Sequence, residues 1–210
     1  MDFRTLHSDK FIGQYLSEGK DAEAMELFDE SLRAACAAGA EKMVLHMWGG
    51  VVSDSCFAHN LTYLPRMVDR CGEAGVTLCV ENVPCSCGDP IAHWRDCEAL
   101  CPDVRFIYDT RFGYFAGTLE RDVGLFSDEV FGKKTVHMHI SDFTGVQHDF
   151  HCLRPIPMPG EGSIDFNSFF SAIKPIYSGT VTLESPSLDE HGHVDPERLS
   201  EAIEYIRQRL

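Results

Sequence analysis

The sequence has too few basic side chains to favour a nucleic-acid partner. Its 18 lysines and arginines stand against 33 aspartates and glutamates, which gives a formal net charge of −15 with histidine neutral. So much negative charge repels a phosphate backbone, whereas it does not repel a divalent cation or a neutral sugar. We therefore predict no nucleic-acid partner.

Long hydrophobic runs are also absent. No stretch reaches the roughly 18 consecutive apolar residues of a membrane span, and residues 1–7 contain no apolar core of a secretory signal. This predicts a cytoplasmic protein without membrane association. The nine cysteines are then expected to be free thiols. The spacing of the closest ones fits neither standard zinc nor iron–sulfur patterns.

No linker or low-complexity run divides the 210 residues, so we predict one domain over residues 1–210. Short apolar, strand-like runs alternate with segments of helical periodicity. The predicted strands are residues 3–7, 43–46, 76–81, 104–109, 135–139 and 180–184, and the predicted helices are residues 21–38, 60–74, 90–100, 166–177 and 196–210. This alternation indicates a parallel sheet covered by helices, with strand spacing close to that of a (β/α)₈ barrel.

Residues at the helix ends support these boundaries. Gly39 and Gly75 stand just past two helices, where a left-handed cap is favoured. Asp165 is expected to cap the N-terminus of one helix, and Asp195–Pro196 to begin the last.

Only six strands are visible, whereas an eight-stranded barrel takes about 250 residues. Because the chain opens directly on a strand, we expect an incomplete TIM-barrel-like α/β sheet of about six βα units that lacks the first two of eight. Its first and last strands would be unpaired edges, and a second copy is expected to cover them in a homodimer.

Every predicted strand ends in His, Asp or Glu. Glu81, Asp109, His139 and Glu184 end four consecutive strands, and the ends of parallel barrel strands share one face. Taken alone, each is better explained as a capping or solvated residue at a strand end. Together their carboxylates would repel one another, and a divalent cation removes that penalty. The mixed oxygen and nitrogen ligands suit Mn²⁺, Mg²⁺, Co²⁺ or Zn²⁺.

Other strand ends and one loop contain further candidate metal ligands. His7 and His46 end the first two strands, and Asp149 and His151 lie in the loop after His139. We predict that some of these residues are additional metal ligands.

Several motifs occur in a characteristic order: HMWGG, GVTLCVEN, FIYDT, HMHISD, an Asp-x-His followed by GEGSIDF, and VTLE. With these motifs nearly the whole chain resembles the xylose isomerase-like TIM barrels. These include sugar phosphate isomerases and epimerases, ketose 3-epimerases, inosose dehydratases, hydroxypyruvate isomerases and endonuclease IV. The resemblance implies a single-metal tetrad of Glu81, Asp109, His139 and Glu184. It also matches His7, His46, Asp149 and His151 to the extra ligands of the three-zinc endonuclease branch.

One position departs from the family pattern. The family's Asp-x-x-His reads Asp109-Thr-Arg-Phe112 here, and Phe112 can neither bind a metal nor hydrogen-bond a sugar hydroxyl. Arg111 or Arg154 could compensate by gripping a phosphate or carboxylate. Otherwise each is expected to be a surface arginine. We predict His46, His151 and Arg154 as substrate contacts.

The resemblance implies a metal-dependent isomerase or epimerase of a sugar or sugar phosphate. The metal would stabilise an enediolate, and Glu81 and Glu184 would remove and return the proton. A dehydratase needs the same chemistry, so it stays open, as does a non-catalytic barrel remnant. A phosphodiesterase acting on DNA is disfavoured by Phe112 and by the net charge.

Overall fold

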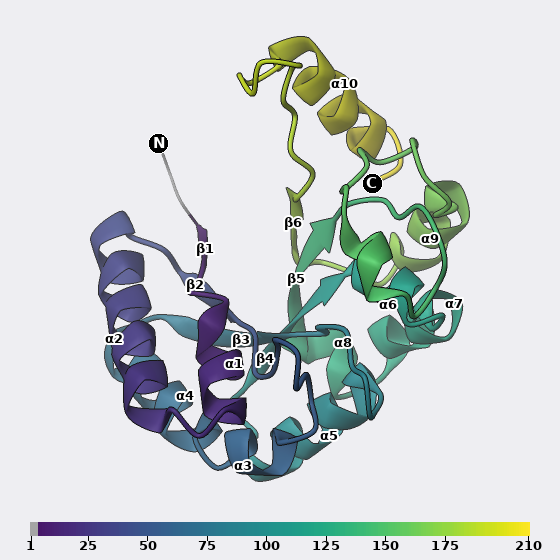
Figure 1. Ribbon diagram of the computed structural model, residues 1–210. Coiled ribbons are helices and arrows are strands. Elements are labelled where there is room, and N and C mark those ends of the chain that lie inside the picture. Colours follow the sequence, from purple (N-terminus) through teal and green to yellow (C-terminus); the bar gives the residue numbers. More distant parts are fainter. Residues whose placement is uncertain (1–3) are drawn as a thin grey trace. The chain divides into compact units, whose positions relative to one another are not determined.

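The computed structural model describes residues 4–210. Phe3, where the first strand was predicted to begin, lies outside the described residues together with Met1 and Asp2. The chain forms two compact units, one ending at Ile107 and the other beginning at Tyr108. Strands alternate with helices along both units, which confirms the predicted α/β, TIM-barrel-like fold (Figure 1).

The first unit contains a parallel sheet whose strands follow one another in chain order. These strands are β1 (Thr5–His7), β2 (Lys42–Leu45), β3 (Thr77–Glu81) and β4 (Arg105–Asp109). The register pairs His7 with Val44, Leu45 with Val80, and Glu81 with Ile107. This register brings the carboxyl ends of β1, β2 and β3 to one edge of the sheet.

The helices of the first unit match the predictions in part. Helices α2 (Asp21–Ala38) and α5 (Pro90–Leu100) have the predicted bounds, and Gly39 ends α2 in the expected left-handed conformation, with a φ of 68°. Helix α1 (Phe11–Ser17), which was not predicted, lies beside α2 (Figure 1).

The prediction of one helix over residues 60–74 is wrong. The segment contains the end of α3 (Phe57–Leu61) and then α4 (Leu64–Glu73). Pro65 stands in the first turn of α4. Since proline has no N–H group, it cannot donate to the carbonyl of Leu61, and a continuous helix is interrupted there.

A close contact fixes α1 against the chain that follows β2. A Cβ atom on Gly13 would lie 2.6 Å from the backbone nitrogen of Trp48 and 2.7 Å from the carbonyl carbon of Met47. Only glycine therefore lets α1 pack on this backbone. Trp48 itself is fully buried in the core of the unit.

The second unit starts with the last two residues of β4, Tyr108 and Asp109. Strands β5 (Thr135–Ile140) and β6 (Thr180–Leu183) pair in parallel, with His139 opposite Thr182. The helical segments of this unit are α6 (Thr110–Phe115), α7 (Leu119–Asp122), η1 (Val123–Ser127), α8 (Phe131–Lys134), η2 (Phe150–Leu153), α9 (Phe166–Ile173) and α10 (Pro196–Arg207).

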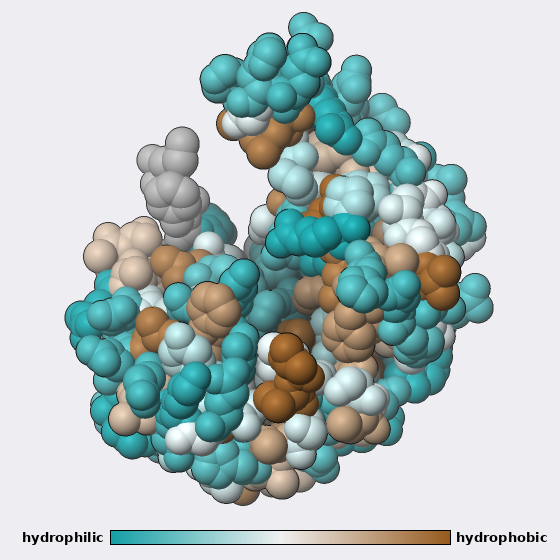
Figure 2. All heavy atoms as spheres, in the orientation of Figure 1, coloured by the Kyte–Doolittle hydropathy of each residue, from teal (hydrophilic) through white to brown (hydrophobic). Residues whose placement is uncertain are grey.

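Two predicted caps of this unit are confirmed. The Asp165 side chain accepts from the backbone N–H of Ser168 at the start of α9, and the Asp195 side chain accepts two N–H groups at the start of α10. Helix α9 stops earlier than predicted because Pro175 has no N–H group to donate to the carbonyl of Ser171. Helix α10 buries Ala202 and presents a hydrophilic outer face (Figure 2).

The nine cysteines are all free thiols, as predicted. Eight of them lie in the first unit, and Cys152 is the one in the second unit. Among those of the first unit, Cys71, Cys79, Cys97 and Cys101 are buried. Burial raises the pKa of both Cys71 and Cys79 to about 12, which keeps these thiols protonated. Among the described residues, no helix has the length and apolarity needed to cross a membrane.

Candidate functional site

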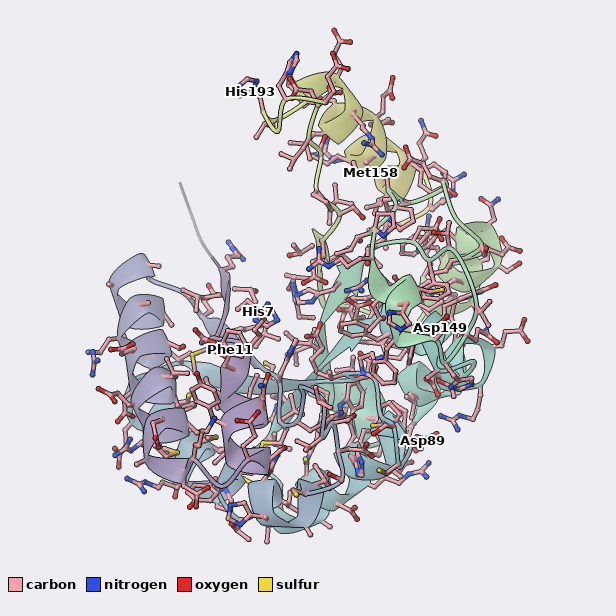
Figure 3. All side chains as sticks on the ribbon, in the orientation of Figure 1. His7, Phe11, Asp89, Asp149, Met158 and His193 are labelled. Atoms are coloured by element: carbon pink, nitrogen blue, oxygen red, sulfur yellow. The ribbon has the colours of Figure 1, made fainter. Side chains whose placement is uncertain are left out.

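Three predicted ligands meet in the first unit. His7 is the last residue of β1, His46 directly follows β2, and Glu81 ends β3. The His46 Nε2 atom lies 2.6 Å from Glu81 Oε2, and His7 Nε2 lies 3.2 Å from His46 Nε2 and 3.4 Å from Glu81 Oε2. Figure 3 shows His7 at its strand. We call this set the first triad.

The first triad can hold either a proton or a cation. Its two longer distances are close to the roughly 3.3 Å that separates ligands about 2.0–2.1 Å from a tetrahedral metal ion. The 2.6 Å contact between His46 and Glu81 is a short hydrogen bond that needs a proton. Glu81 is fully buried, and either partner would stabilise its charge.

Three further predicted ligands meet in the second unit. Asp109 ends β4, His139 lies in β5, and Glu184 directly follows β6. Their ligand atoms lie within 4.8 Å of one another, and His139 Nδ1 is 3.5 Å from Glu184 Oε2. The backbone N–H of Glu184 donates to the carbonyl of Ile140 at 2.9 Å, which extends the ladder and fixes Glu184 beside β5. We call this set the second triad.

An unsatisfied oxygen shows that the second triad fits a divalent cation. Glu184 Oε2 is buried and accepts no hydrogen bond from the part of the chain that the structure describes. A buried carboxylate oxygen without a donor costs free energy. A cation between Asp109, His139 and Glu184 would remove this cost, and their two carboxylates and one imidazole are ligands for such an ion.

Neighbouring side chains hold the second triad in place. Asp109 Oδ1 accepts the backbone N–H of Phe112 at 3.0 Å and so caps α6. His137 bonds through Nδ1 to Thr180 Oγ1 at 2.6 Å, and its ring packs edge-on against His139 with centroids 5.2 Å apart. The ring of His139 is therefore supported from within its own strand.

A sequence model of the family described as xylose isomerase-like TIM barrel matches residues 10–209. The chain belongs to this family. No curated protein matches it in sequence.

Solved structures share the fold of this xylose isomerase-like chain. The IolI protein, whose structure contains a bound zinc atom, is 20% identical in sequence. The match covers 91% of this chain and 69% of the IolI chain, with a TM-score of 0.62. The 3-keto-D-glucoside 4-epimerase of E. coli is 17% identical; the match covers 97% of this chain and 78% of the epimerase, with a TM-score of 0.65. The D-allulose 3-epimerase of Methylomonas sp. is 21% identical; the match covers 98% of this chain and 76% of the epimerase, with a TM-score of 0.63.

Other predicted site residues of this xylose isomerase-like chain stand apart from such clusters. Asp149 Oδ1 accepts the backbone N–H of His151 at 2.9 Å and caps η2 (Figure 3). His151 and Arg154 are exposed. Among the described residues, none of these three belongs to a group of converging metal-ligand atoms.

Arg111 differs from its predicted surface position. It is buried, with 6% of its surface exposed. Its Nε donates to Ser141 Oγ at 3.3 Å and its Nη1 to the carbonyl of Leu153 at 3.2 Å. The expectation of a surface arginine is therefore wrong at this position.

The structure contains a cluster around Asp54 that was not predicted from the sequence. The buried Asp54 carboxylate accepts the backbone N–H groups of Ser86, Cys87 and Gly88 at 2.9, 2.9 and 2.7 Å, and His93 Nε2 lies 2.9 Å from its Oδ2. Burial raises the pKa of Asp54, but these hydrogen bonds outweigh it and hold the pKa well below its usual range. No local motif predicts this cluster, because its members come from two separate loops and from α5.

The Asp54 cluster also includes Cys85, so three kinds of metal-ligand atom converge here. Burial and the neighbouring charge of Asp54 raise the pKa of the Cys85 thiol. Both oxygens of Asp54 already accept hydrogen bonds, and the protonated thiol is a poor ligand. The cluster therefore acts as a clasp that holds the loop after β3.

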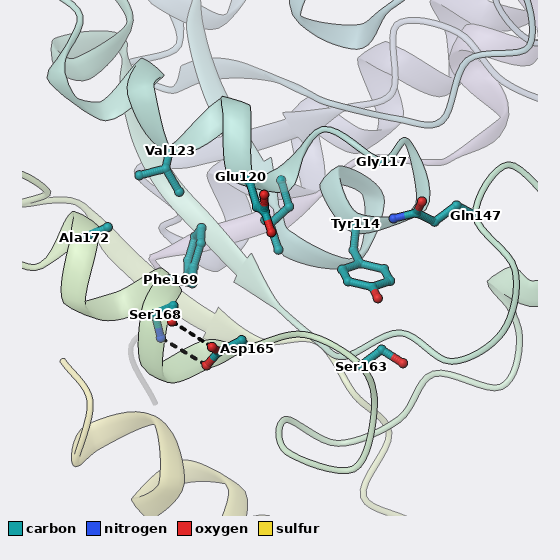
Figure 4. Close-up of a pocket in the computed structure, with 11 residues that line it drawn as sticks. Tyr114, Gly117, Glu120, Val123, Gln147, Ser163, Asp165, Ser168, Phe169 and Ala172 are labelled. Atoms are coloured by element: carbon teal, nitrogen blue, oxygen red, sulfur yellow. Dashed lines mark hydrogen bonds between the residues drawn. The ribbon is translucent and has the colours of Figure 1, made fainter.

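The second unit has a cavity of about 630 Å³ that no predicted site residue lines. Tyr114, Glu120, Asp165 and Phe169 are among its walls (Figure 4). The Asp165 carboxylate is occupied by hydrogen bonds from the N–H and hydroxyl of Ser168.

Proposed function

We propose that the chain is a metal-dependent isomerase or epimerase of a sugar or sugar phosphate. The observation that carries this proposal is the second triad, Asp109, His139 and Glu184, with its buried and unsatisfied carboxylate oxygen. The names of its structural neighbours support the reaction class, since two of those compared above are sugar epimerases.

The proposed metal ligands are Asp109, His139 and Glu184, with Glu81 as the fourth by its place in the family motif. The first triad adds His7 and His46 as candidate ligands around Glu81. Asp149 and His151 remain proposals drawn from the resemblance alone. The carboxylate-rich set favours Mn²⁺ or Mg²⁺, while the zinc bound in IolI keeps Zn²⁺ a candidate. When bound, the cation supplies stabilisation of the negative charge that develops as a proton leaves carbon next to a carbonyl.

Two carboxylates are proposed to carry the proton. Glu184 is proposed to accept it through its second carboxylate oxygen, because Oε2 faces His139 and is the oxygen proposed to bind the cation. Glu81 shares a 2.6 Å hydrogen bond with His46, so a proton on this pair can pass between the two side chains. His46 is thereby a proton carrier for Glu81 as well as a candidate substrate contact.

The proposed substrate is a small sugar or sugar phosphate, contacted by His46, His151 and Arg154. A homodimer and a cytoplasmic location also stay proposals from the sequence.

The test is metal analysis of the purified protein, followed by exchange of substrate hydrogen in D₂O. The metal-loaded protein is mixed with a panel of ketoses, aldoses and their phosphates, and NMR follows the hydrogen on the carbon next to the carbonyl. We expect one bound divalent ion and exchange with at least one compound. If the metal-loaded protein exchanges nothing across the panel, the enzymatic function is refuted. Loss of water without isomerisation would instead identify a dehydratase.

A further inference from the structure

The guanidinium of Arg111 is a buried charge whose one carboxylate contact is long. Its two hydrogen bonds go to neutral acceptors, the hydroxyl of Ser141 and the carbonyl of Leu153. The nearest carboxylate contact is Asp109 Oδ2, 3.9 Å from Nη2, which is too long for a hydrogen bond. The ion pair with Asp109 therefore compensates the buried charge without a hydrogen bond, and a closer anionic oxygen would stabilise it further.

The donors of Arg111 are only partly used. A guanidinium has five N–H donors in a fixed plane, and the Nη2 group donates to no residue that the structure describes. The ring of Phe112 lies against the guanidinium, with Cζ 4.4 Å from the ring centroid. This stacking and the two hydrogen bonds fix the plane, so that the unused donors have a set direction.

These unused donors lie at the second triad. The guanidinium comes two residues after Asp109, and Nη2 is the nitrogen on the Asp109 side. In the proposed function Asp109 binds a metal ion, so its charge is shared with that ion and satisfies Arg111 less well. An anionic group that reaches the second triad would meet donors that are already oriented.

We propose that Arg111 makes the site select substrates that carry an anionic oxygen group, a phosphate or a carboxylate. The selection between substrates in turnover rests on the proposed function, whereas the binding of an anion by Arg111 can be measured without it. The planar fork of an arginine can hold two oxygens of such a group at once, whereas a lysine offers one point of charge. Arg111 is thus a specificity residue, and the exposed Arg154 is not needed for this step.

The first test compares neutral and anionic substrates in wild type, Arg111→Met and Arg111→Lys. Fructose is paired with fructose 6-phosphate, and glyceraldehyde with tartronate semialdehyde, and kcat/KM is taken from hydrogen exchange in D₂O. For the anionic member we expect a loss of about 10- to 100-fold in Arg111→Met, the usual worth of hydrogen bonds to a charged group. For the neutral member we expect a change below about 3-fold. An equal loss for both members, or no loss, overturns the proposal while leaving the proposed function intact.

The second test measures binding without turnover. Inorganic phosphate and acetate are titrated separately into metal-loaded wild type and variants by calorimetry. We expect at least one of the two anions to bind, with a Kd that rises about 10-fold or more in Arg111→Met and less in Arg111→Lys. The two titrations distinguish a phosphate preference from a carboxylate preference. If neither anion binds, or if both bind the variants as tightly as wild type, the proposal is wrong even if the protein is an active isomerase.

The matched control is Arg207→Met, which removes an exposed arginine of α10 in the same unit. It should behave as wild type in both tests, so a general effect of lost positive charge is separated from an effect at Arg111. Thermal unfolding of each variant shows whether it folds. If Arg111→Met does not fold, Arg111→Lys keeps the charge and must still show the selective loss.

Discussion

Replacing Asp54 by asparagine tests whether this carboxylate is a hydrogen-bonding clasp or a metal ligand. The asparagine side chain has nearly the same shape, but it keeps one acceptor oxygen and loses the charge. One side of it would then present an NH₂ group to the N–H of Gly88 and to His93, where Asp54 Oδ2 now accepts. At least one backbone N–H group is left without its acceptor.

The cost follows from these contacts. Hydrogen bonds to a charged group contribute about 1.5–3 kcal/mol each, and they do not add fully. Losing the acceptor for Gly88 and weakening the bonds to Ser86 and Cys87 should lower the free energy of unfolding by about 2–4 kcal/mol. For a chain of this length, that corresponds to a fall in Tm of roughly 5–15 °C. The exposed Asp96 of α5 offers a matched control, since Asp96→Asn should leave Tm nearly unchanged.

The contribution of Asp54 to the free energy of unfolding should decrease at low pH. The pKa of Asp54 is lowered in the folded chain, so its contribution to stability is complete above the pKa of the unfolded chain, about 4. That contribution is lost as the pH falls below about 4 toward the lower folded pKa. The difference in unfolding free energy between wild type and Asp54→Asn should therefore be constant from about pH 7 to 5 and shrink below about pH 4.

Urea unfolding at several pH values, with and without a chelator, decides between clasp and metal site. A clasp predicts the same difference between wild type and Asp54→Asn in both conditions. If the chelator removes that difference, or if the two proteins unfold alike at neutral pH, the hydrogen-bond reasoning is refuted.

Other expected outcomes concern the second triad and the packing of α1. Glu184→Gln should keep the fold and much of the metal but lower turnover by about 10²–10⁴-fold, which is the usual contribution of a general base. Hydrogen exchange in D₂O measures the turnover, and undiminished exchange would contradict the role of Glu184 as a base. Asp109→Asn and His139→Ala should lower the metal content found by elemental analysis, and added metal should restore part of the activity. Gly13→Ala should lower Tm, because the added methyl group would collide with the backbone of neighbouring residues. Gly72→Ala lies in α4 with open space around it and should raise the free energy of unfolding by about 0.5–1 kcal/mol. Similar Tm shifts in the two variants would contradict the packing argument.

Periodicity and local caps were sufficient to predict most elements. The bounds of α2 and α5 and the left-handed Gly39 follow from signals within one helix and its neighbours. The break between α3 and α4 depends on Pro65, a signal that was present in the sequence and outweighed by the apolar pattern. Helix α1 is short and contains a glycine, so its stability comes from packing on distant backbone that no local pattern reports.

Some residues of the candidate site could likewise be predicted from local sequence signals, and others could not. Strand ends predict where His139 and Glu184 stand, because parallel strands place their ends on one side. The burial of Arg111 depends on Ser141 and on Leu153, which are far away in sequence, so composition alone favours a surface position. Asp54 is similar, since its partners lie in a loop more than thirty residues further along.

The uneven distribution of the cysteines makes the chain its own reporter of local opening. A thiol reagent reaches Cys71, Cys79, Cys97 and Cys101 only when the first unit opens, whereas Cys152 in the second unit is only partly buried. The rate at which the four buried thiols are alkylated in native buffer, read by mass spectrometry of peptides, therefore gives an opening free energy for the first unit, and Cys152 serves as the partly exposed reference. No mutation is needed, and the same measurement applied to every variant shows whether a substitution loosens the first unit.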